Sequence, residues 1–452
     1  MVLEKRHLIP RSYRGDLKKA IRGEGIYIYD QDGKEYIDGC CGALLSSIGH
    51  GNKEIADAVY RQMTTLEFAH PSRWNTEASE EAASELASIA PGDLNHVWFG
   101  SGGSEAMECA MKLARNYFLE RDGAGSAKTV FIARWNSYHG STLGTMGLAG
   151  NMGRRRPYSL LFRECPKIET PYCYRSELRD APEEEQARYY AQLLEREIRR
   201  IGKQYVAAFV AEPIVGSSIG ACVPPEGYWR MIREICTRYD VLLIADEIMT
   251  GMGRTGKPFC VEHWGVQPDI ITSAKALSGG YSPVGAAIAS DTIIETILKG
   301  SGVFGHGHTY NANPTTAAAV TATIRFMKKN NIFENCAKRG EQFGKLLLGM
   351  LDIPFVGDVR GKGLMWGVEL VEDKETRKPF EPARKAAAMV AAECMEQGLV
   401  IYPGTGQIDG VEGDQFLIAP PLIISEEQVK EIARRLRAGL EAAAEKLARK
   451  QG

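Results

Sequence analysis

A single lysine stands between an apolar run and a glycine-rich turn in the segment ITSAKALSGGYSPVG, residues 271–285. Lysine is among the residue types least often fully buried, so Lys275 is unusual where a strand leaves a core. One interpretation is a solvated lysine that opens a short helix. The other is a lysine held for covalent chemistry with a carbonyl compound.

An aspartate ends a second apolar run, VLLIADEI, at residues 241–248. A buried Asp246 needs a partner or a cation, because an unpaired carboxylate in a core is costly. It could balance the cationic ring nitrogen of a cofactor, bind Mg²⁺ or cap the following turn. Asp246 and Lys275 lie about one strand-turn-helix unit apart and could flank one planar ligand. Tyr138 and His139 follow another apolar run and offer an aromatic face.

A glycine- and serine-rich turn precedes a helical pattern in WFGSGGSEAMECAMKLAR, residues 98–115. Backbone N–H groups at such a helix start bind anions, and Gly102, Gly103 and Ser104 would let a phosphate approach closely. The segment matches neither the P-loop nor the dinucleotide fingerprint. Ser104 could instead be only a helix N-cap.

The elements that must position these residues form an α/β pattern from about residue 96 to 290. Continuous apolar runs alternate with helical stretches, which predicts a mainly parallel sheet covered on both faces. The predicted strands are 96–100, 128–134, 206–214, 241–248, 269–275 and 284–290. The predicted helices are 104–120, 183–203 and 226–239, with a long loop region after residue 134. Ligands of such sheets bind at the carboxyl ends of the strands, where the polar residues above lie.

The two ends of the chain predict a smaller α+β unit. Alternating residues about a Gln-Asp-Gly-Lys turn predict a β-hairpin at 25–39. The remaining predicted elements are helices at 52–66, 76–89, 311–330, 382–397 and from 425, two strands within 355–370, and strands at 399–402 and 416–424. We therefore expect an N-terminal segment (1–65) of the small domain, a large domain (66–330) and a C-terminal part of the small domain (331–452).

Composition and charge exclude several function classes. The chain has 452 residues, of which 44% are apolar and 25% charged, and its formal net charge is −2. No global field therefore draws it to nucleic acid or to a membrane. The densest basic run, Arg154-Arg155-Arg156, is predicted to be solvated surface or a contact with substrate or a partner chain. The N-terminus has no apolar signal-like core, and no apolar run reaches the ~20 residues that span a bilayer.

Cysteine and histidine usage indicates no metal. The ten cysteines include no Cys-x-x-Cys pair, and the adjacent Cys40 and Cys41 are unsuited to a mutual disulfide. His306 and His308 alternate without an acidic or thiolate partner nearby. We expect reduced, mostly buried thiols in a cytoplasmic protein.

Seven motifs, in matching order and spacing, resemble the class III aminotransferases, which are pyridoxal-phosphate enzymes of fold type I. The motifs are SGGSEAMECAMKLAR, YHGST, AEPI, ADEIMTGMGRTG, SAKALSGGYSPVGA, GHTYNANP and VRGKGLMWGVEL. The resemblance covers about residues 20 to 440. It implies a large domain with a mainly parallel seven-stranded sheet and a smaller α+β domain from the N- and C-terminal segments.

The resemblance also implies roles around the cofactor, pyridoxal 5′-phosphate. Lys275 matches the Schiff-base lysine of the family, and Asp246 matches the aspartate that pairs with the pyridine nitrogen. Tyr138 matches the aromatic residue stacked on one face of the ring. Ile248 stands where the family usually has a valine packed on the other face.

The remaining matches concern the phosphate and the supporting residues. Gly103 and Ser104 match the phosphate cup, His139 follows the stacking tyrosine, and Glu212 matches a glutamate near the ring. Thr309 matches the threonine that reaches the phosphate from the other subunit. The resemblance thus implies a homodimer with shared active sites, and it leaves open whether dimers pair into tetramers.

The implied activity is transamination. An amino group moves from an amine or ω-amino acid to a keto acid such as pyruvate, by way of a 1,3-proton shift in which the freed lysine acts as base and then acid. The same scaffold also supports racemases or epimerases, aminomutases, decarboxylases and phospholyases, which Lys275 and Asp246 cannot distinguish. A non-catalytic descendant is disfavoured, because every cofactor residue is present.

The substrate pocket departs from several branches of the family. Met249 stands where ornithine- and GABA-type members usually carry glutamine. Leu44 and Leu45 stand where many amine:pyruvate members have an aromatic residue. Ser425 and Glu426 occupy the place of a mobile arginine that grips a carboxylate in many relatives.

The anchor of a substrate carboxylate therefore stays open at this point. Arg73, Trp74 and the run 154–156 are candidates, each of which could also be structural. Trp74 and Leu44 are the candidate residues of the substrate-pocket wall.

Overall fold

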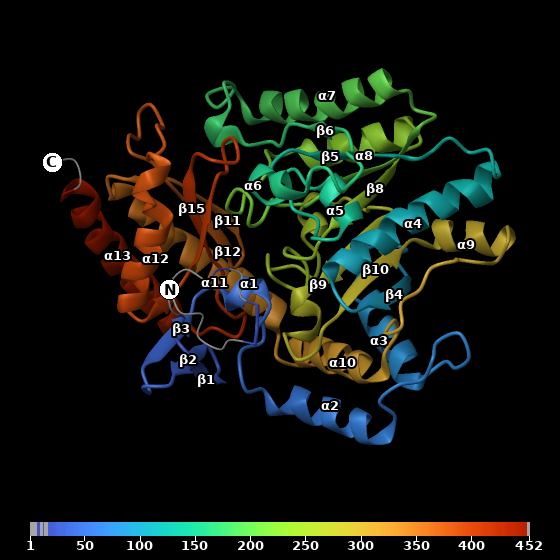
Figure 1. The fold of residues 1–452 in the computed structure, drawn as a ribbon, viewed down its shortest axis with the longest axis horizontal. Coiled ribbons are helices and arrows are strands. Elements are labelled where there is room, and N and C mark those ends of the chain that lie inside the picture. Colours follow the sequence, from blue (N-terminus) through green and yellow to red (C-terminus); the bar gives the residue numbers. More distant parts are fainter. Residues whose placement is uncertain (1–6, 10–11, 13–16, 450–452) are drawn as a thin grey trace.

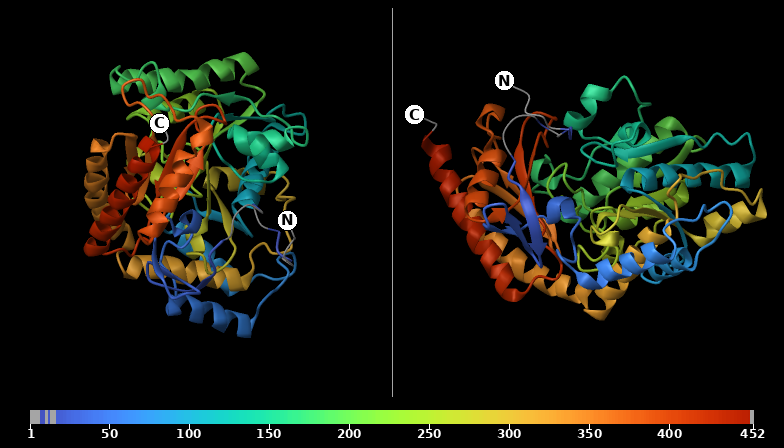
Figure 2. Two further views of the ribbon diagram at one scale, coloured as in Figure 1. Left: turned by 60° about the vertical axis from the view of Figure 1, so that its left-hand side comes forward. Right: turned by 60° about the horizontal axis from the view of Figure 1, so that its bottom comes forward.

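The structure is a computed structural model that describes residues 7–9, 12 and 17–449. The prediction of no signal-like core concerns residues most of which lie outside this range. In Figures 1 and 2 a large sheet with its helices forms one part of the molecule, and α11–α13 with the N-terminal strands form the other.

A seven-stranded sheet forms the centre of the larger part, in the order β4-β10-β9-β8-β7-β5-β6. Its strands are β4 (His96–Gly100), β5 (Val130–Arg134), β6 (Lys167–Ile168), β7 (Val206–Ala211), β8 (Leu242–Asp246), β9 (Ile270–Ala274) and β10 (Gly285–Ala289). Only β10 runs antiparallel to its neighbours, β4 and β9. The predicted α/β class and mainly parallel sheet are confirmed. The two-residue edge strand β6 was not predicted, because it is too short to carry a pattern.

Helices cover both faces of this sheet, as the continuous apolar strands predict. The helices of this part are α3 (Glu77–Ala87), α4 (Gly103–Asp122), α5 (Leu143–Leu148), α6 (Met152–Arg155), α7 (Glu183–Ile201), α8 (Tyr228–Arg238), α9 (Asp291–Lys299) and α10 (Pro314–Lys329). Val210 and Ile244 pack in one core with α4 and α9. Their neighbours Phe209 and Leu243 point to the opposite face and pack with α7 and α8. Successive residues of each strand therefore fill two different cores.

Several helices begin at residues that cap them. Asn52 and Thr76 accept hydrogen bonds from N–H groups in the first turns of α2 (Lys53–Thr65) and α3. Asn313 does the same for α10, where Pro314 takes the first helical position. The predicted helices at 52–66, 76–89 and 311–330 are thus confirmed with slightly shorter bounds.

The smaller part joins elements from both ends of the chain. Its other elements are β1 (Ala20–Glu24), β2 (Tyr27–Asp30), β3 (Glu35–Asp38), α1 (Cys41–Leu44), α11 (Ile332–Leu348), β11 (Val356–Lys362), β12 (Met365–Leu370), α12 (Ala386–Glu396), β13 (Leu399–Val400), β14 (Tyr402–Thr405), β15 (Asp414–Ile418) and α13 (Glu426–Arg449). Strand β13 pairs parallel with β3, so the predicted N-terminal hairpin and the C-terminal third share one sheet. A second sheet has the order β11-β12-β15-β14. The exact boundaries at residues 65 and 330 stay a prediction.

Several details differ from the sequence analysis. Helices α9 and α11 were not predicted, and the strand expected at 416–424 ends at Ile418. The region after residue 134 was predicted as loop, yet it contains the short helices α5 and α6. Gly144 and Gly147 break the helical pattern of this stretch, which hides α5 from a reading of the sequence. Residue Gly102, not Ser104, is the N-cap of α4, so the interpretation of Ser104 as a helix cap is wrong.

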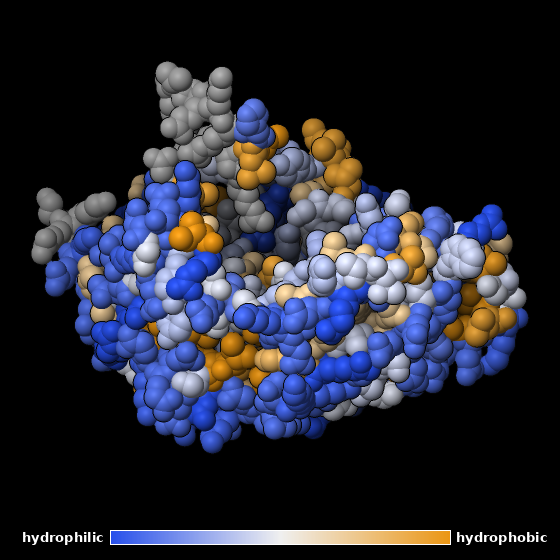
Figure 3. All heavy atoms as spheres, turned by 90° about the horizontal axis from the view of Figure 1, so that it is seen from below, coloured by the Kyte–Doolittle hydropathy of each residue, from blue (hydrophilic) through white to orange (hydrophobic). Residues whose placement is uncertain are grey.

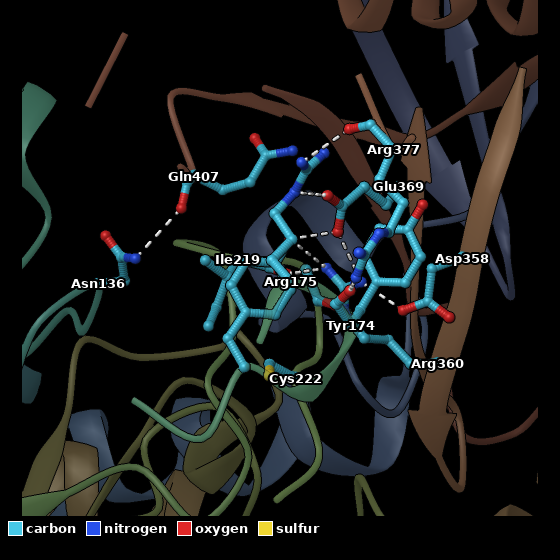
Figure 4. A network of polar contacts seen from close by, with 12 residues as sticks. Asn136, Tyr174, Arg175, Ile219, Cys222, Asp358, Arg360, Glu369, Arg377 and Gln407 are labelled. Atoms are coloured by element: carbon cyan, nitrogen blue, oxygen red, sulfur yellow. Dashed lines mark hydrogen bonds and ion pairs between the residues drawn. The ribbon is translucent and has the colours of Figure 1, made fainter. Parts of the chain in front are cut away.

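A buried polar network joins the two parts (Figure 4). Glu369 on β12 is fully buried and accepts hydrogen bonds from Arg175 Nε at 2.6 Å and from Arg360 Nη1 at 2.8 Å. The Tyr172 hydroxyl also donates to this carboxylate, and burial raises the pKa of Tyr172 well above its usual value. Arg360 further pairs with Asp358 at 2.6 Å. Because Tyr172 and Arg175 precede α7 in the chain, the network fastens the smaller part to the larger one.

None of the helices within the described ranges combines the length and the apolar character needed to cross a bilayer. Figure 3 shows the face that carries α2, where hydrophobic side chains gather in patches on a largely hydrophilic surface.

Candidate active site

Three neighbouring parallel strands end at one edge of the large sheet. Strand β7 is followed by Glu212, β8 ends at Asp246, and β9 is followed by Lys275. Because β7, β8 and β9 pair in parallel, their carboxyl ends lie side by side. The topology thus brings the three ionisable residues together at the sheet edge where ligands of open α/β sheets bind.

Lys275 opens the 3₁₀ turn η4 (Lys275–Ser278) with a left-handed backbone, φ = +46°. A non-glycine residue is uncommon in this region, and such conformations cluster at functional sites. Burial lowers the pKa of Lys275, although Asp246 and Glu212 oppose this effect, and Arg154 adds to the lowering. The side chain therefore supplies a neutral amine more readily than a surface lysine does.

Asp246 is buried and bonded on both oxygens. Its Oδ2 lies 2.7 Å from His139 Nδ1, and its Oδ1 accepts a hydrogen bond from the N–H of Ile248 at 3.1 Å. The carboxylate accepts a hydrogen bond from the Nδ1–H group of His139. The other ring nitrogen, Nε2, is buried and has no hydrogen-bond partner among the described residues. Asp246 is thus held from two sides where it lines the cavity described below.

Glu212 connects the end of β7 to the loop that carries Tyr138. Its Oε1 accepts from the Tyr138 N–H at 3.0 Å, and its Oε2 accepts from the Gly216 N–H at 2.9 Å. Burial raises the pKa of Glu212; the nearby His139 opposes this and Asp246 adds to it. Glu212 therefore positions Tyr138 by a hydrogen bond to the tyrosine backbone and not by a contact with the tyrosine ring.

The start of α4 provides unpaired N–H groups. The N-cap Gly102 makes no side-chain cap, and the N–H groups of Gly103 and Ser104 have no hydrogen-bond partner within the described part of the chain. A Cβ at Gly102 would meet no atom within 4 Å, so this backbone faces open space. Gly140 lies close by, because a Cβ there would stand 2.5 Å from Ser104 Oγ. The helix N-terminus is therefore an open anion site.

These residues line one cavity of about 450 Å³. Of the predicted cofactor residues, it brings together Gly103, Ser104, Tyr138, His139, Glu212, Asp246, Ile248 and Lys275. Thr309 is exposed and does not line this cavity. The cavity also includes Tyr281, Ser282 and Pro283 of the turn after Lys275, which the sequence analysis did not single out. Their place in the quoted segment SGGYSPVG, next to the lysine, was the available signal.

A second cavity of about 880 Å³ adjoins the first. The two share Tyr138, Gly140, Met249 and Lys275. Leu44 lines the larger cavity, as expected of a pocket-wall residue, whereas Trp74 is 68% exposed and lines neither. The larger cavity also includes Asn151, Ser217 and Tyr402, for which the sequence offered no signal.

The residues of the smaller cavity fit pyridoxal phosphate. The unpaired N–H groups of α4 suit its phosphate, and the Asp246 carboxylate suits a protonated ring nitrogen. Lys275 lies in the same cavity and suits its aldehyde. No cluster of three or more potential metal ligands occurs within the described ranges.

Comparison with known proteins places these observations in a family context. The family model "Aminotransferase class-III" matches residues 10–440. An uncharacterised aminotransferase of Bacillus subtilis, YodT, is 42% identical over 90% of this chain and 91% of the relative. A putrescine–pyruvate aminotransferase of Pseudomonas aeruginosa is 36% identical over 91% of this chain and 88% of the relative.

Solved structures agree with the sequence relatives. An ω-transaminase of Pseudomonas jessenii in complex with PMP superposes with a TM-score of 0.91 at 32% identity, over 97% of both chains. An (S)-enantioselective ω-transaminase of Thermomicrobium roseum superposes with a TM-score of 0.90 at 33% identity, over 97% of this chain and 96% of the other.

Proposed function

Because this chain belongs to the class III aminotransferases, which use pyridoxal phosphate, we propose that it moves an amino group from an ω-amino acid or amine to a keto acid such as pyruvate. The observation that carries the proposal is the shared cavity of Lys275, Asp246 and the α4 N-terminus. The names of the relatives, which include a putrescine–pyruvate aminotransferase, support amine donors and pyruvate as acceptor.

Each residue has a definite task in this proposal. Pyridoxal phosphate, when bound, supplies the electron sink for the electrons released when the substrate Cα–H bond breaks. Asp246 keeps the ring nitrogen protonated, and His139 fixes the orientation of that carboxylate through the 2.7 Å contact. Gly103 and Ser104 would bind the phosphate through their backbone, and Tyr138 and Ile248, which line the same cavity, would cover the two faces of the ring.

Lys275 performs two tasks in succession. Its ε-amine would hold the cofactor covalently, until the amine of the substrate takes its place. The freed ε-amine would then take the proton from the substrate Cα as general base and give it up as general acid at the cofactor carbon, the other end of the 1,3-shift, rather than back to Cα. The lowered pKa of Lys275 supports this, because a neutral amine is the form that accepts the proton.

We propose that the active unit is a homodimer. Exposed apolar side chains support an interface near Thr309: Tyr310 is 63% exposed, and Tyr60 and Met63 of α2 are 68% and 54% exposed. Large exposed apolar side chains of this kind mark interaction sites. Thr309 would then reach the phosphate of the partner subunit. A sedimentation measurement that yields only monomer at micromolar concentration would contradict this.

A cytoplasmic location is part of the same proposal. All ten cysteines are free, and most of them are buried, which supports a reducing compartment.

The experiment is a donor panel with two readouts. The cofactor-loaded protein is incubated with ω-amino acids, amines and α-amino acids, and both the cofactor absorbance and the formation of alanine from pyruvate are followed. Alanine that requires both donor and pyruvate supports transamination. Loss of optical purity of an α-amino acid without any keto acid would instead identify a racemase or epimerase. Lys275→Ala should abolish turnover, whereas Lys299→Ala, at an exposed lysine of α9, should not change it.

A further inference from the structure

The cavity that leads to Lys275 is lined by cations and by no carboxylate of the described chain. Its basic lining residues are Arg154, Arg155 and Lys275, of which Lys275 serves as a neutral amine in the proposed function, so the two arginines are the cations. Much of the rest is apolar, including Leu143, Met146 and Met249. Such a pocket attracts an anionic group and offers no counter-ion to a second cation.

The two arginines of this lining differ in their partners. Arg155 is buried and forms an ion pair with Glu164. The guanidinium of Arg154 has neither an ion pair nor a hydrogen bond to any residue that the structure describes; it lies over the Tyr138 ring, 4.6 Å from its centroid. Stacking fixes the plane of a guanidinium and leaves its N–H edge free. Arg154 is exposed to solvent, and its guanidinium N–H groups are therefore donors to which no described residue provides an acceptor.

The backbone around Arg154 is tied to the Tyr138 loop. Asn151 caps α6 by accepting the Arg154 N–H at 3.1 Å, and its own N–H donates to the Ser137 carbonyl at 3.0 Å. The Asn151 side chain also donates to Ser218 Oγ at 3.2 Å. These contacts hold the arginine beside the aromatic residue proposed to cover the cofactor ring.

We propose that Arg154 binds the carboxylate of the substrate, so that amino acids and keto acids are preferred over amines and diamines that lack a carboxylate. A guanidinium pairs with a carboxylate through two parallel hydrogen bonds, which fixes position as well as charge. The apolar side chains around it suit the methylene chain of an aliphatic ω-amino acid. This inference rests on the proposed function, since it names the substrate class of the same site.

The test compares Arg154→Met with Arg156→Met. Arg156 belongs to the same basic run and is exposed, but it does not line the cavity. The first measurement is calorimetric titration of the cofactor-loaded protein with propionate, a carboxylate that has neither an amine nor a carbonyl group to react. Arg154→Met should weaken propionate binding about tenfold or more, and Arg156→Met should not change it. Arg154→Lys should fall between, because lysine keeps the charge but not the paired donors.

The second measurement is steady-state kinetics with 5-aminopentanoate and with butylamine as donors. Arg154→Met should lower kcat/KM for 5-aminopentanoate about tenfold and leave kcat/KM for butylamine unchanged or higher, because this ratio reports the donor half-reaction alone. Propionate binding that is equally tight in wild type and Arg154→Met would overturn the inference, as would an unchanged kcat/KM for 5-aminopentanoate. Propionate binding that depends on Arg154 without any amino transfer would support the inference while the proposed function failed.

Discussion

Replacing Glu369 by glutamine should destabilise the junction between the two parts of the chain. The change keeps the shape of the side chain and removes the charge that two largely buried arginines share, whose side chains are 15% and 11% exposed. Glu369 lies 2.6 Å from Arg175 Nε and 2.8 Å from Arg360 Nη1. Removing one member of a buried ion pair typically costs about 3–5 kcal/mol, because an uncompensated charge stays buried. Since Asp358 still pairs with Arg360 at 2.6 Å, we expect the lower end, about 3 kcal/mol.

The assay is guanidinium unfolding followed by the fluorescence of the six tryptophans. Asp358→Asn is the matched control: its side chain is 25% exposed and pairs with the same arginine, so its loss should cost about 1 kcal/mol or less. Adding Arg175→Met to Glu369→Gln should restore part of the lost stability, because it removes one of the stranded charges. The reasoning is refuted if Glu369→Gln lowers the unfolding free energy no more than Asp358→Asn does. It is also refuted if Arg175→Met lowers the unfolding free energy of Glu369→Gln by as much as it lowers that of the wild type.

Three further predictions concern the site and its surroundings. Burial raises the pKa of Glu247 from 4.5 to about 7, so the folded protein holds a proton that the unfolded chain has lost between these values. As the pH rises from 4.5 to 7, the unfolding free energy of the wild type should therefore fall by about 3 kcal/mol relative to that of Glu247→Gln. Urea unfolding at several pH values measures this difference. Unfolding free energies of wild type and variant that change in parallel with pH would contradict the prediction. Asp246→Asn should lower kcat by about 100-fold or more with little change in melting temperature, and near-normal turnover would exclude a role for its charge. Gly285→Ala should destabilise the protein by about 1–3 kcal/mol, because the new Cβ would stand 2.1 Å from the Gly102 carbonyl oxygen. Gly125→Ala is the control, since a Cβ there would meet no atom within 4 Å. Equal melting temperatures of the two variants would refute this prediction.

The sequence predicted the large sheet because its strands carry apolar residues on both faces. Phe209 and Leu243 had to face a different layer of helices from Val210 and Ile244, and the structure places them so. The direction of β10 could not be predicted, since an all-apolar strand reads the same in a parallel or an antiparallel pair. Likewise α5 stayed hidden, because its glycines remove the periodic signal.

The candidate site was predicted where motif residues follow a strand directly. Lys275 and Asp246 stand at strand ends, so the topology alone brings them together. Arg154 could not be assigned in the same way: its neighbour Arg155 has the same residue type in the same run, and only packing shows that one is paired and the other is not. Thr309 and Trp74 face solvent in a single chain, so its geometry assigns neither of them a role at the site.

The pairing of β13 with β3 has a consequence for synthesis on the ribosome. Residues 35–38 of β3 leave the ribosome early in synthesis. The strand that pairs with their free edge, β13 at residues 399–400, is synthesised more than 350 residues later. Until then the nascent chain exposes an unpaired strand edge, the feature that templates aggregation. The large sheet needs only residues up to 289, so it can form before that edge is covered. A transcript truncated before codon 399 would thus yield a product with its main sheet complete but its N-terminal hairpin open to non-native association.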